Sequence, residues 1–261
     1  MPQLPAMVQA LLDPKAYPES PSGVEMVQTQ MSFVFLAGDY VYKVKKPVNL
    51  GYLDYTTLDK RRFYCQRELE LNQRLCPDAY LGVVPITKNK SEIVIAGQGE
   101  VIEYAVKMRR LPQERMLNVL LVKSQVSAEM LSRVAAKLAV FHQQAETSDA
   151  ISSFGGIDAI RLNSEENFSQ TLKYFGRTIS QARYQHIKDY TNSFIERNAP
   201  LFTKRVAGGK IRDCHGDLHA AHICFADGIC IYDCIEFNDR FRYCDVASEI
   251  AFLAMDLDHY G

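Results

Sequence analysis

The chain has 261 residues, of which 47% are hydrophobic, so it is long enough to bury the core of one large domain or of two lobes. Its formal net charge of −1 provides no overall field that would attract nucleic acid or an anionic membrane. It has seven cysteines, no basic-then-apolar signal pattern at its N-terminus, and no apolar run near the roughly 20 residues that span a bilayer. These features predict a cytoplasmic protein with reduced thiols and argue against nucleic-acid or membrane partners.

The first half of the chain predicts strands around one helix. Residues 1–23 are rich in proline and are interpreted as an N-terminal extension. Apolar residues at helical spacing predict a helix over residues 57–76 that carries Glu68 in or beside its inward stripe, where an unpaired carboxylate is costly and needs a cation. Runs rich in β-branched and aromatic residues predict strands at residues 33–36, 40–45, 91–96 and 100–106.

The second half predicts helices after a short connector. Residues 108–112 break the strand pattern. Helical patterns follow at residues 127–141, 164–175, 178–197 and 246–257. Asp227-Gly228 predicts a hairpin turn before the last of these helices. The order predicts an α+β chain with a β-rich lobe over residues 24–107 and a helical lobe over residues 113–261.

A histidine-rich segment at residues 214–222 is the most informative part of the chain. Gly216 allows a sharp turn before Asp217, whose carboxylate can accept a proton or orient a hydroxyl group. His222 follows five residues later, and Asp233 ends a short hairpin sixteen residues past Asp217. This spacing suits the placement of a substrate hydroxyl beside a nucleotide γ-phosphate that a metal ion holds.

These residues, with the two-lobe order, resemble the aminoglycoside phosphotransferase family of the protein-kinase-like fold over residues 24–257. The resemblance implies an ATP-dependent phosphotransferase that acts on a hydroxyl of a small molecule. It makes Asp217 the catalytic carboxylate and Asp233 a ligand of Mg²⁺, with Mn²⁺ as the alternative ion. It also implies that Lys43 contacts the phosphates and pairs with Glu68.

The same resemblance implies a nucleotide-binding hinge and a partner domain. The connector at residues 108–112 would be the hinge, where backbone groups of Met108, Arg109, Arg110 and Leu111 would bind adenine. The similarity is closest to uncharacterised phosphotransferase-like domains that a P-loop ATP-binding domain often follows. A fused or separate P-loop domain is therefore an expected partner.

Several assignments stay open at this point. Lys45 lies on the same strand face as Lys43 and competes for the phosphate-binding role. His222, assigned to the metal, stands where the family has Asn, so it binds through water, shifts the metal preference or weakens the site. No glycine-rich phosphate loop is present, and Thr29 and Ser32 are the hydroxyl donors at the equivalent place.

Two other functions compete with phosphoryl transfer. One is a nucleotide-binding regulatory module with little turnover. The other is a Zn²⁺ site, for which suitable ligand types are present at Cys214, His215, His219, His222 and Cys224. Four further carboxylates are interpreted as solvated or helix-capping groups, with help in metal binding as the alternative: Glu236, Asp239, Asp245 and Glu249. No sequence feature identifies the acceptor molecule.

Overall fold

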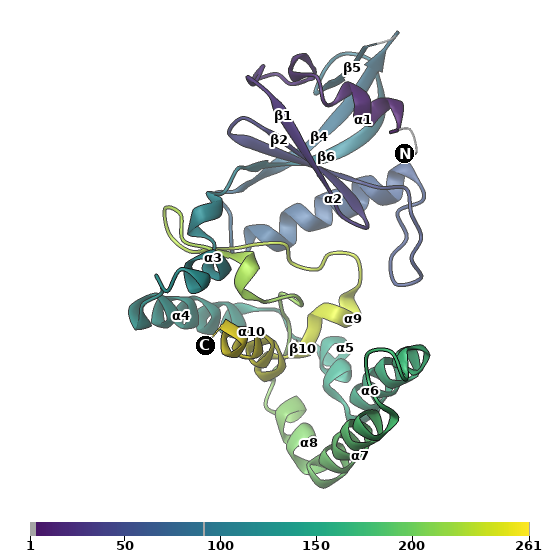
Figure 1. Ribbon diagram of the computed structural model, residues 1–261, viewed down its shortest axis with the longest axis vertical. Helices are drawn as coiled ribbons and strands as arrows, with labels where there is room; N and C mark the ends of the chain where they lie inside the picture. Colours follow the sequence, from purple (N-terminus) through teal and green to yellow (C-terminus); the bar gives the residue numbers. More distant parts are fainter. Residues whose placement is uncertain (1–3, 91, 261) are drawn as a thin grey trace.

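The computed structural model of the chain describes residues 4–90 and 92–260. Figure 1 shows an upper lobe, formed by a curved sheet and helix α2 (Leu58–Gln73), above a mainly helical lower lobe. The predicted α+β architecture with two lobes is therefore confirmed. The parts of the predicted extension, strand and helical lobe that fall on residues 1–3, 91 and 261 lie outside the described residues.

The upper lobe is built on a six-stranded antiparallel sheet with the order β1-β2-β3-β6-β4-β5. Its strands are β1 (Val24–Gln28), β2 (Ser32–Ala37), β3 (Tyr40–Lys45), β4 (Tyr80–Asn89), β5 (Glu92–Ile95) and β6 (Glu100–Arg109). Strand β4 was not predicted, because Gly82 and Pro85 interrupt its pattern. The sheet tolerates Pro85 because pairing with β5 begins only at Ile86, so a proline without an N–H group stands at the end of that ladder.

The two faces of the sheet carry different side chains because residues alternate along each strand. Tyr42 and Val44 of β3 are fully buried in the outer core, which also contains residues of helix α1 (Ala6–Ala10). Lys43 and Lys45 lie on the inner face, toward α2 and the lower lobe. The predicted N-terminal extension is thus a cover for the outer face of the sheet.

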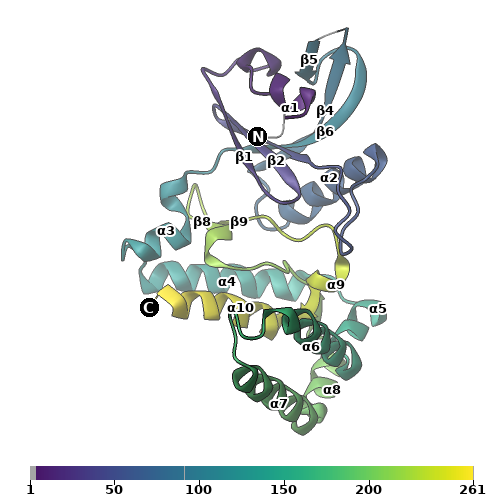
Figure 2. The same ribbon diagram turned by 45° about the vertical axis from the view of Figure 1, so that its right-hand side comes forward.

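The lower lobe places its loops beneath the sheet. Its larger elements are α3 (Leu117–Val122), α4 (Ala128–Gln144), α6 (Ile157–Thr171), α7 (Gln181–Arg197), α8 (Ala199–Ala207) and α10 (Val246–Tyr260). Its short elements are α5 (Asp149–Ser152), β7 (Ile211–Asp213), β8 (Ile223–Cys224), β9 (Cys230–Ile231), α9 (Asp239–Arg242) and β10 (Tyr243–Asp245). Helices α4 and α10 run side by side in Figures 1 and 2, and they share a core through Leu138 and Leu253. Within the described ranges, the structure contains no helix of the length and apolarity that crossing a membrane requires.

A disulfide links the two lobes. Cys76, just beyond the end of α2, is bonded to Cys230 of β9, 154 positions later in the chain, with 4.7 Å between their Cα atoms. The expectation that all thiols are reduced is therefore wrong for this pair. The cysteines that the structure shows as free are Cys65, Cys214, Cys224, Cys234 and Cys244.

Candidate active site

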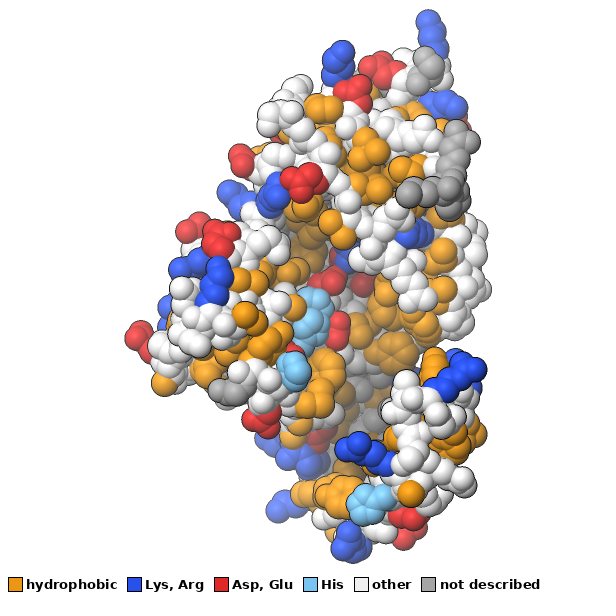
Figure 3. Space-filling view, viewed as in Figure 1, with side chains coloured by type: hydrophobic (Ala, Val, Ile, Leu, Met, Phe, Trp, Pro, Cys, Tyr) orange, Lys and Arg blue, Asp and Glu red, His pale blue; other side chains and the backbone are white. Residues whose placement is uncertain are grey.

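A cavity of about 650 Å³ separates the inner face of the sheet from the loops of the lower lobe. Its upper wall is apolar, with Val34, Leu36 and Val41, and its rear wall is the chain from β6 into the lower lobe. Its floor includes Asp217 and Asp233. Figure 3 shows this hollow, with histidine and acidic side chains at its centre.

Lys43 joins the upper wall of the cavity to its floor. Its Nζ lies 2.8 Å from Glu68 Oε1 and donates to Asp233 Oδ1 at 2.6 Å. Burial opposes the charge of Lys43, but Asp233 and Glu68 outweigh burial and raise its pKa well above the usual value. The predicted pairing of a strand lysine with Glu68 is present, and the same lysine reaches the second predicted carboxylate.

Lys45 has a different environment. Its side chain is 1% exposed, and it contacts Glu68 Oε2 at 2.7 Å and Glu236. Tyr55 donates its hydroxyl to the same Glu236 oxygen at 2.6 Å. Since Lys43 lines the cavity and Lys45 lies behind it, the geometry favours Lys43 for contact with a bound group and Lys45 for structural support.

The turn that carries Asp217 is fixed from below. Gly216 has φ +87°, and a Cβ atom there would lie 2.9 Å from the carbonyl oxygen of Phe241, so both conformation and space require glycine. Glu249 Oε1 accepts from the N–H groups of His215 at 2.5 Å and Gly216 at 2.9 Å. The interpretation of Glu249 as a solvated carboxylate is therefore wrong, because it is buried and holds this turn.

We expect Glu249→Ala to lower the free energy of unfolding by about 2–4 kcal/mol. The change leaves two buried N–H groups without an acceptor and removes the partner of His142, whose Nε2 lies 2.5 Å from Glu249 Oε2. Urea unfolding followed by circular dichroism measures the loss. Asp258→Ala, at an exposed position of the same helix, is the control and is expected to change stability by less than about 0.5 kcal/mol. Equal effects of the two variants would contradict the anchoring role.

His215 is fully buried, and both of its ring nitrogens are used. Nε2 lies 2.9 Å from the carbonyl oxygen of Tyr232, which only accepts, and Nδ1 accepts from the N–H of Asp217 at 3.3 Å. Burial is the main cause that lowers the pKa of His215 to about 4, and the opposing charge of Glu249 is smaller. A proton on Nδ1 would face the N–H of Asp217, which is also a donor. The folded protein therefore keeps this ring neutral.

Acid is therefore expected to destabilise the protein through His215. The unfolded chain binds this proton below about pH 6.5, but the folded chain binds it only near pH 4, so stability falls as the pH drops through that window, by up to about 3 kcal/mol. Urea midpoints at pH 7.5 and 4.5 measure the loss in the wild type. In His215→Gln this component should disappear, and an undiminished acid effect in the variant would assign it to other groups.

His222 lies between the two predicted carboxylates. Its Nδ1 is 2.9 Å from the backbone carbonyl oxygen of Asp217, and its Nε2 is 3.6 Å from Asp233 Oδ2. The side chains of Asp217 and Asp233 are 40% and 41% exposed. Sequence reasoning placed all three residues in one site, and the structure brings them together.

Asp233 occupies an unusual backbone position. It has φ +64°, which a residue with a side chain adopts at a cost of about 1–3 kcal/mol, and its N–H donates to the hydroxyl of Tyr80 at 3.3 Å. Burial opposes ionisation of its carboxyl group, but the nearby ammonium group of Lys43 holds its pKa well below the usual range. The site thus keeps Asp233 negatively charged.

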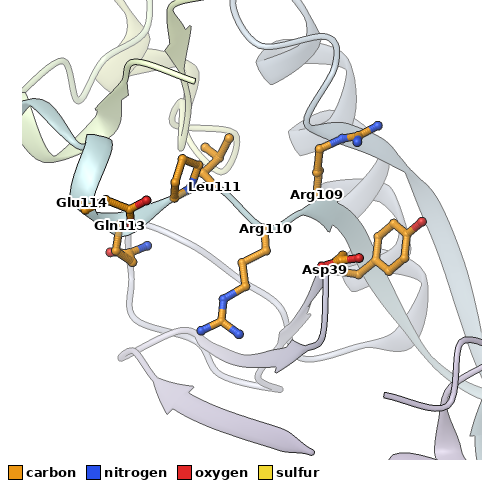
Figure 4. A pocket seen from close by; sticks show the side chains of 8 residues that line it. Asp39, Arg109, Arg110, Leu111, Gln113 and Glu114 are labelled. Atoms are coloured by element: carbon orange, nitrogen blue, oxygen red, sulfur yellow. The ribbon is translucent and has the colours of Figure 1, made fainter. Parts of the chain in front are cut away.

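The hinge residues line the cavity, but most of their backbone donors are already used. Met108 pairs with Tyr80 and Val41 within the sheet, Arg109 N–H donates to the Ala79 carbonyl, and Arg110 N–H donates to the Asp39 carbonyl. The side chains of Arg109 and Arg110 point in opposite directions beside a smaller cavity of about 530 Å³ (Figure 4). Among the described residues, no hydrogen bond uses the N–H of Leu111, which lines the larger cavity. The predicted hinge includes this residue.

Other predicted groups separate in space. Thr29 lines the cavity, but Ser32 is fully buried and donates its N–H to Thr29 Oγ1 at 3.0 Å. The Zn²⁺ ligand set does not assemble, because Cys214 Sγ contacts the Cys244 carbonyl and Cys224 Sγ contacts the Pro112 carbonyl. The roles of Tyr55 and Glu236 were not predicted from the sequence. The one feature that could have indicated Glu236 is its position three residues after Asp233, and no comparable feature marks Tyr55.

No family model matches the chain. It is 32% identical over 239 residues to uncharacterized proteins of Mycobacterium tuberculosis and Mycobacterium bovis. The match covers 91% of this chain and 46% of each mycobacterial protein, so the chain spans about half the length of the curated relatives it matches. A solved structure of a choline/ethanolamine kinase family protein from Mesorhizobium loti is similar with a TM-score of 0.47 and 13% identity, over 97% of this chain and 71% of that one.

Proposed function

We propose that this protein is an ATP-dependent phosphotransferase that moves the γ-phosphate of ATP to a hydroxyl group of a small molecule. One observation carries the proposal: Lys43 from the sheet and Asp217 and Asp233 from the lower lobe all reach the same cavity. A cation for phosphate, a carboxylate for metal and a second carboxylate for an acceptor hydroxyl are the groups that phosphoryl transfer needs. The protein-kinase-like fold is part of this proposal.

The lining of the cavity favours one orientation for a bound nucleotide. Adenine would lie against Val34, Leu36 and Met108, where the N–H of Leu111 is available as a donor. The triphosphate would then extend toward Lys43, whose side chain is 15% exposed. Binding would draw Lys43 from Asp233 toward the phosphates and leave Glu68 as its remaining partner.

The residues at the floor fit a divalent ion. Asp233 Oδ2 and His222 Nε2 lie 3.6 Å apart, close to the separation of two ligands that each lie about 2.0–2.2 Å from one ion. These two side chains would hold the ion, for which the resemblance predicted Mg²⁺, with Mn²⁺ as the alternative. When bound, the ion would neutralise phosphate charge.

Asp217 would orient the acceptor. Its carboxylate is half-exposed at the edge of the floor, and its backbone is fixed by the Gly216 turn and by His222. Holding a hydroxyl in line with the γ-phosphate supplies most of the rate in such reactions, and the carboxylate can accept the proton as the new bond forms.

Nucleotide binding is the first test. The purified chain should be stabilised by ATP with Mg²⁺ or Mn²⁺, by about 2.7 kcal/mol when the ligand reaches 100 times its Kd. ADP formation across a panel of small alcohols and sugars then tests phosphoryl transfer. Absence of nucleotide binding by both thermal shift and calorimetry would reject the proposal.

A nucleotide-binding module with little turnover is the second candidate. The turn between β1 and β2 contains Thr29-Gln30-Met31 and no glycine, so it supplies fewer free backbone donors for phosphate than a glycine-rich loop. Nucleotide binding without ADP formation across the acceptor panel would favour this reading. The expected P-loop partner domain stays a prediction, as does any activity of a longer protein.

A further inference from the structure

The two histidines beside Asp217 hold their protons on different ring nitrogens. His222 Nδ1 is 2.9 Å from a backbone carbonyl oxygen, which can only accept, so this nitrogen carries the proton and Nε2 of the neutral ring has a lone pair. His219 Nδ1 lies 3.3 Å from the N–H of Ala221, which can only donate, so in His219 the proton is on Nε2. Backbone contacts therefore assign opposite tautomers to neighbouring rings.

The lone pair of His222 faces a second acceptor. Nε2 lies 3.6 Å from Asp233 Oδ2, and the other Asp233 oxygen already accepts from Lys43. Two acceptors that face each other repel unless a proton or a metal ion lies between them. A ring whose second nitrogen donates to a backbone carbonyl is also the usual arrangement of a histidine that binds a metal ion.

His219 lacks these properties. Its Nε2–H lies 3.8 Å from Asp217 Oδ2, so this nitrogen presents a proton to that carboxylate. Asp217, His219 and His222 lie close enough to suggest a metal site of their own. In that group, however, His222 presents Nδ1 to Asp217 at 3.7 Å, and both histidine nitrogens that face Asp217 carry protons. The ion belongs on the Asp233 side of His222.

We propose that the ion in this site is a divalent transition metal rather than Mg²⁺, bound by His222 Nε2 and Asp233 Oδ2 and not by His219. This inference rests on the proposed nucleotide site and specifies its ion. Mg²⁺ strongly prefers oxygen ligands and gives up water reluctantly, whereas first-row transition ions accept imidazole and phosphate oxygen together. The backbone carbonyl of Asp217 orients the His222 ring before the ion arrives.

Electron spin-echo spectroscopy of bound Mn²⁺ tests the ligand directly. The protein is mixed with Mn²⁺ and β,γ-methylene-ATP, which has no nitrogen in its phosphate chain. We expect the ¹⁴N modulation of a directly bound imidazole in the wild type and in His219→Gln, and its loss in His222→Asn. Modulation that survives in His222→Asn, or that disappears in His219→Gln, overturns the assignment.

The metal preference is measured in the same samples. Competition between Mn²⁺ and Mg²⁺, followed through the free Mn²⁺ signal, gives the ratio of their dissociation constants with the analogue bound. We expect His222→Asn to shift this ratio toward Mg²⁺ by about tenfold or more, and comparison with wild type cancels the intrinsic preference of the nucleotide. An unchanged ratio overturns the proposal.

The outcomes separate this inference from the proposed function. If the analogue binds and wild-type Mn²⁺ shows no imidazole coupling, the ion assignment fails and the nucleotide site stands. If the analogue does not bind at all, the proposed function fails first. Thermal midpoints confirm that the variants fold, and His222→Gln replaces His222→Asn if the latter does not.

Discussion

Asp217→Asn is expected to reduce phosphoryl transfer about 10²- to 10⁴-fold while ATP affinity changes less than about threefold. The amide keeps the shape of the side chain but cannot accept the proton of the acceptor hydroxyl. The Asp217 N–H still donates to His215 and its carbonyl still accepts from His222, so the turn is retained. ADP formation with a responsive acceptor and calorimetry with ATP measure the two quantities.

Asp227→Asn is the matched control, since Asp227 is exposed in the neighbouring β8–β9 hairpin. It should leave both quantities unchanged. Turnover at the wild-type rate in Asp217→Asn would remove Asp217 from the chemistry. A parallel loss of ATP affinity would instead indicate that this carboxylate supports the nucleotide site.

Substitution of the two lysines of β3 is expected to affect different properties of the protein. Lys45→Met is expected to lower the free energy of unfolding by about 3–5 kcal/mol, because it leaves Glu68 and Glu236 buried without this cation. Lys43→Met should cost less stability, since Glu68 keeps Lys45 and Asp233 is 41% exposed. It should instead weaken ATP binding about 10- to 100-fold, the range for loss of a charge-assisted hydrogen bond.

Urea unfolding and ATP titration of the same two variants provide the comparison. Each variant serves as the control for the other, because the residues share one strand face and one acidic partner. If Lys45→Met weakens ATP binding in a fully folded protein more than Lys43→Met does, the roles assigned here are reversed.

The sequence identified the parts of the site whose requirements are local. A glycine before Asp217 reflects a backbone with positive φ, and an acidic residue in the inward stripe of a helix requires a cation wherever that cation comes from. Both inferences led to residues that the structure brings to one cavity: Asp217 directly, and Lys43 through Glu68.

The remaining features depend on partners far apart in the chain. Glu236 reaches Lys45 across 191 positions, and Glu249 reaches the His215 turn across 34, so neither could be distinguished from a solvated carboxylate by its neighbours. Lys43 and Lys45 lie on the same strand face, so the sequence pattern does not distinguish their roles. The structure does, because Lys43 lines the cavity and Lys45 is buried behind it. Strand β4 was missed because the pairing that tolerates Pro85 is set by β5 and β6.

The bridge between Cys76 and Cys230 restricts how the molecule can move. It fastens the region behind Glu68 to the strand that leads into Asp233, with 4.7 Å between the two Cα atoms. Any rotation of the upper lobe relative to the lower lobe must therefore pivot about this disulfide and about Arg110, where the chain passes from one lobe to the other. The cavity can then widen only on the side away from this link.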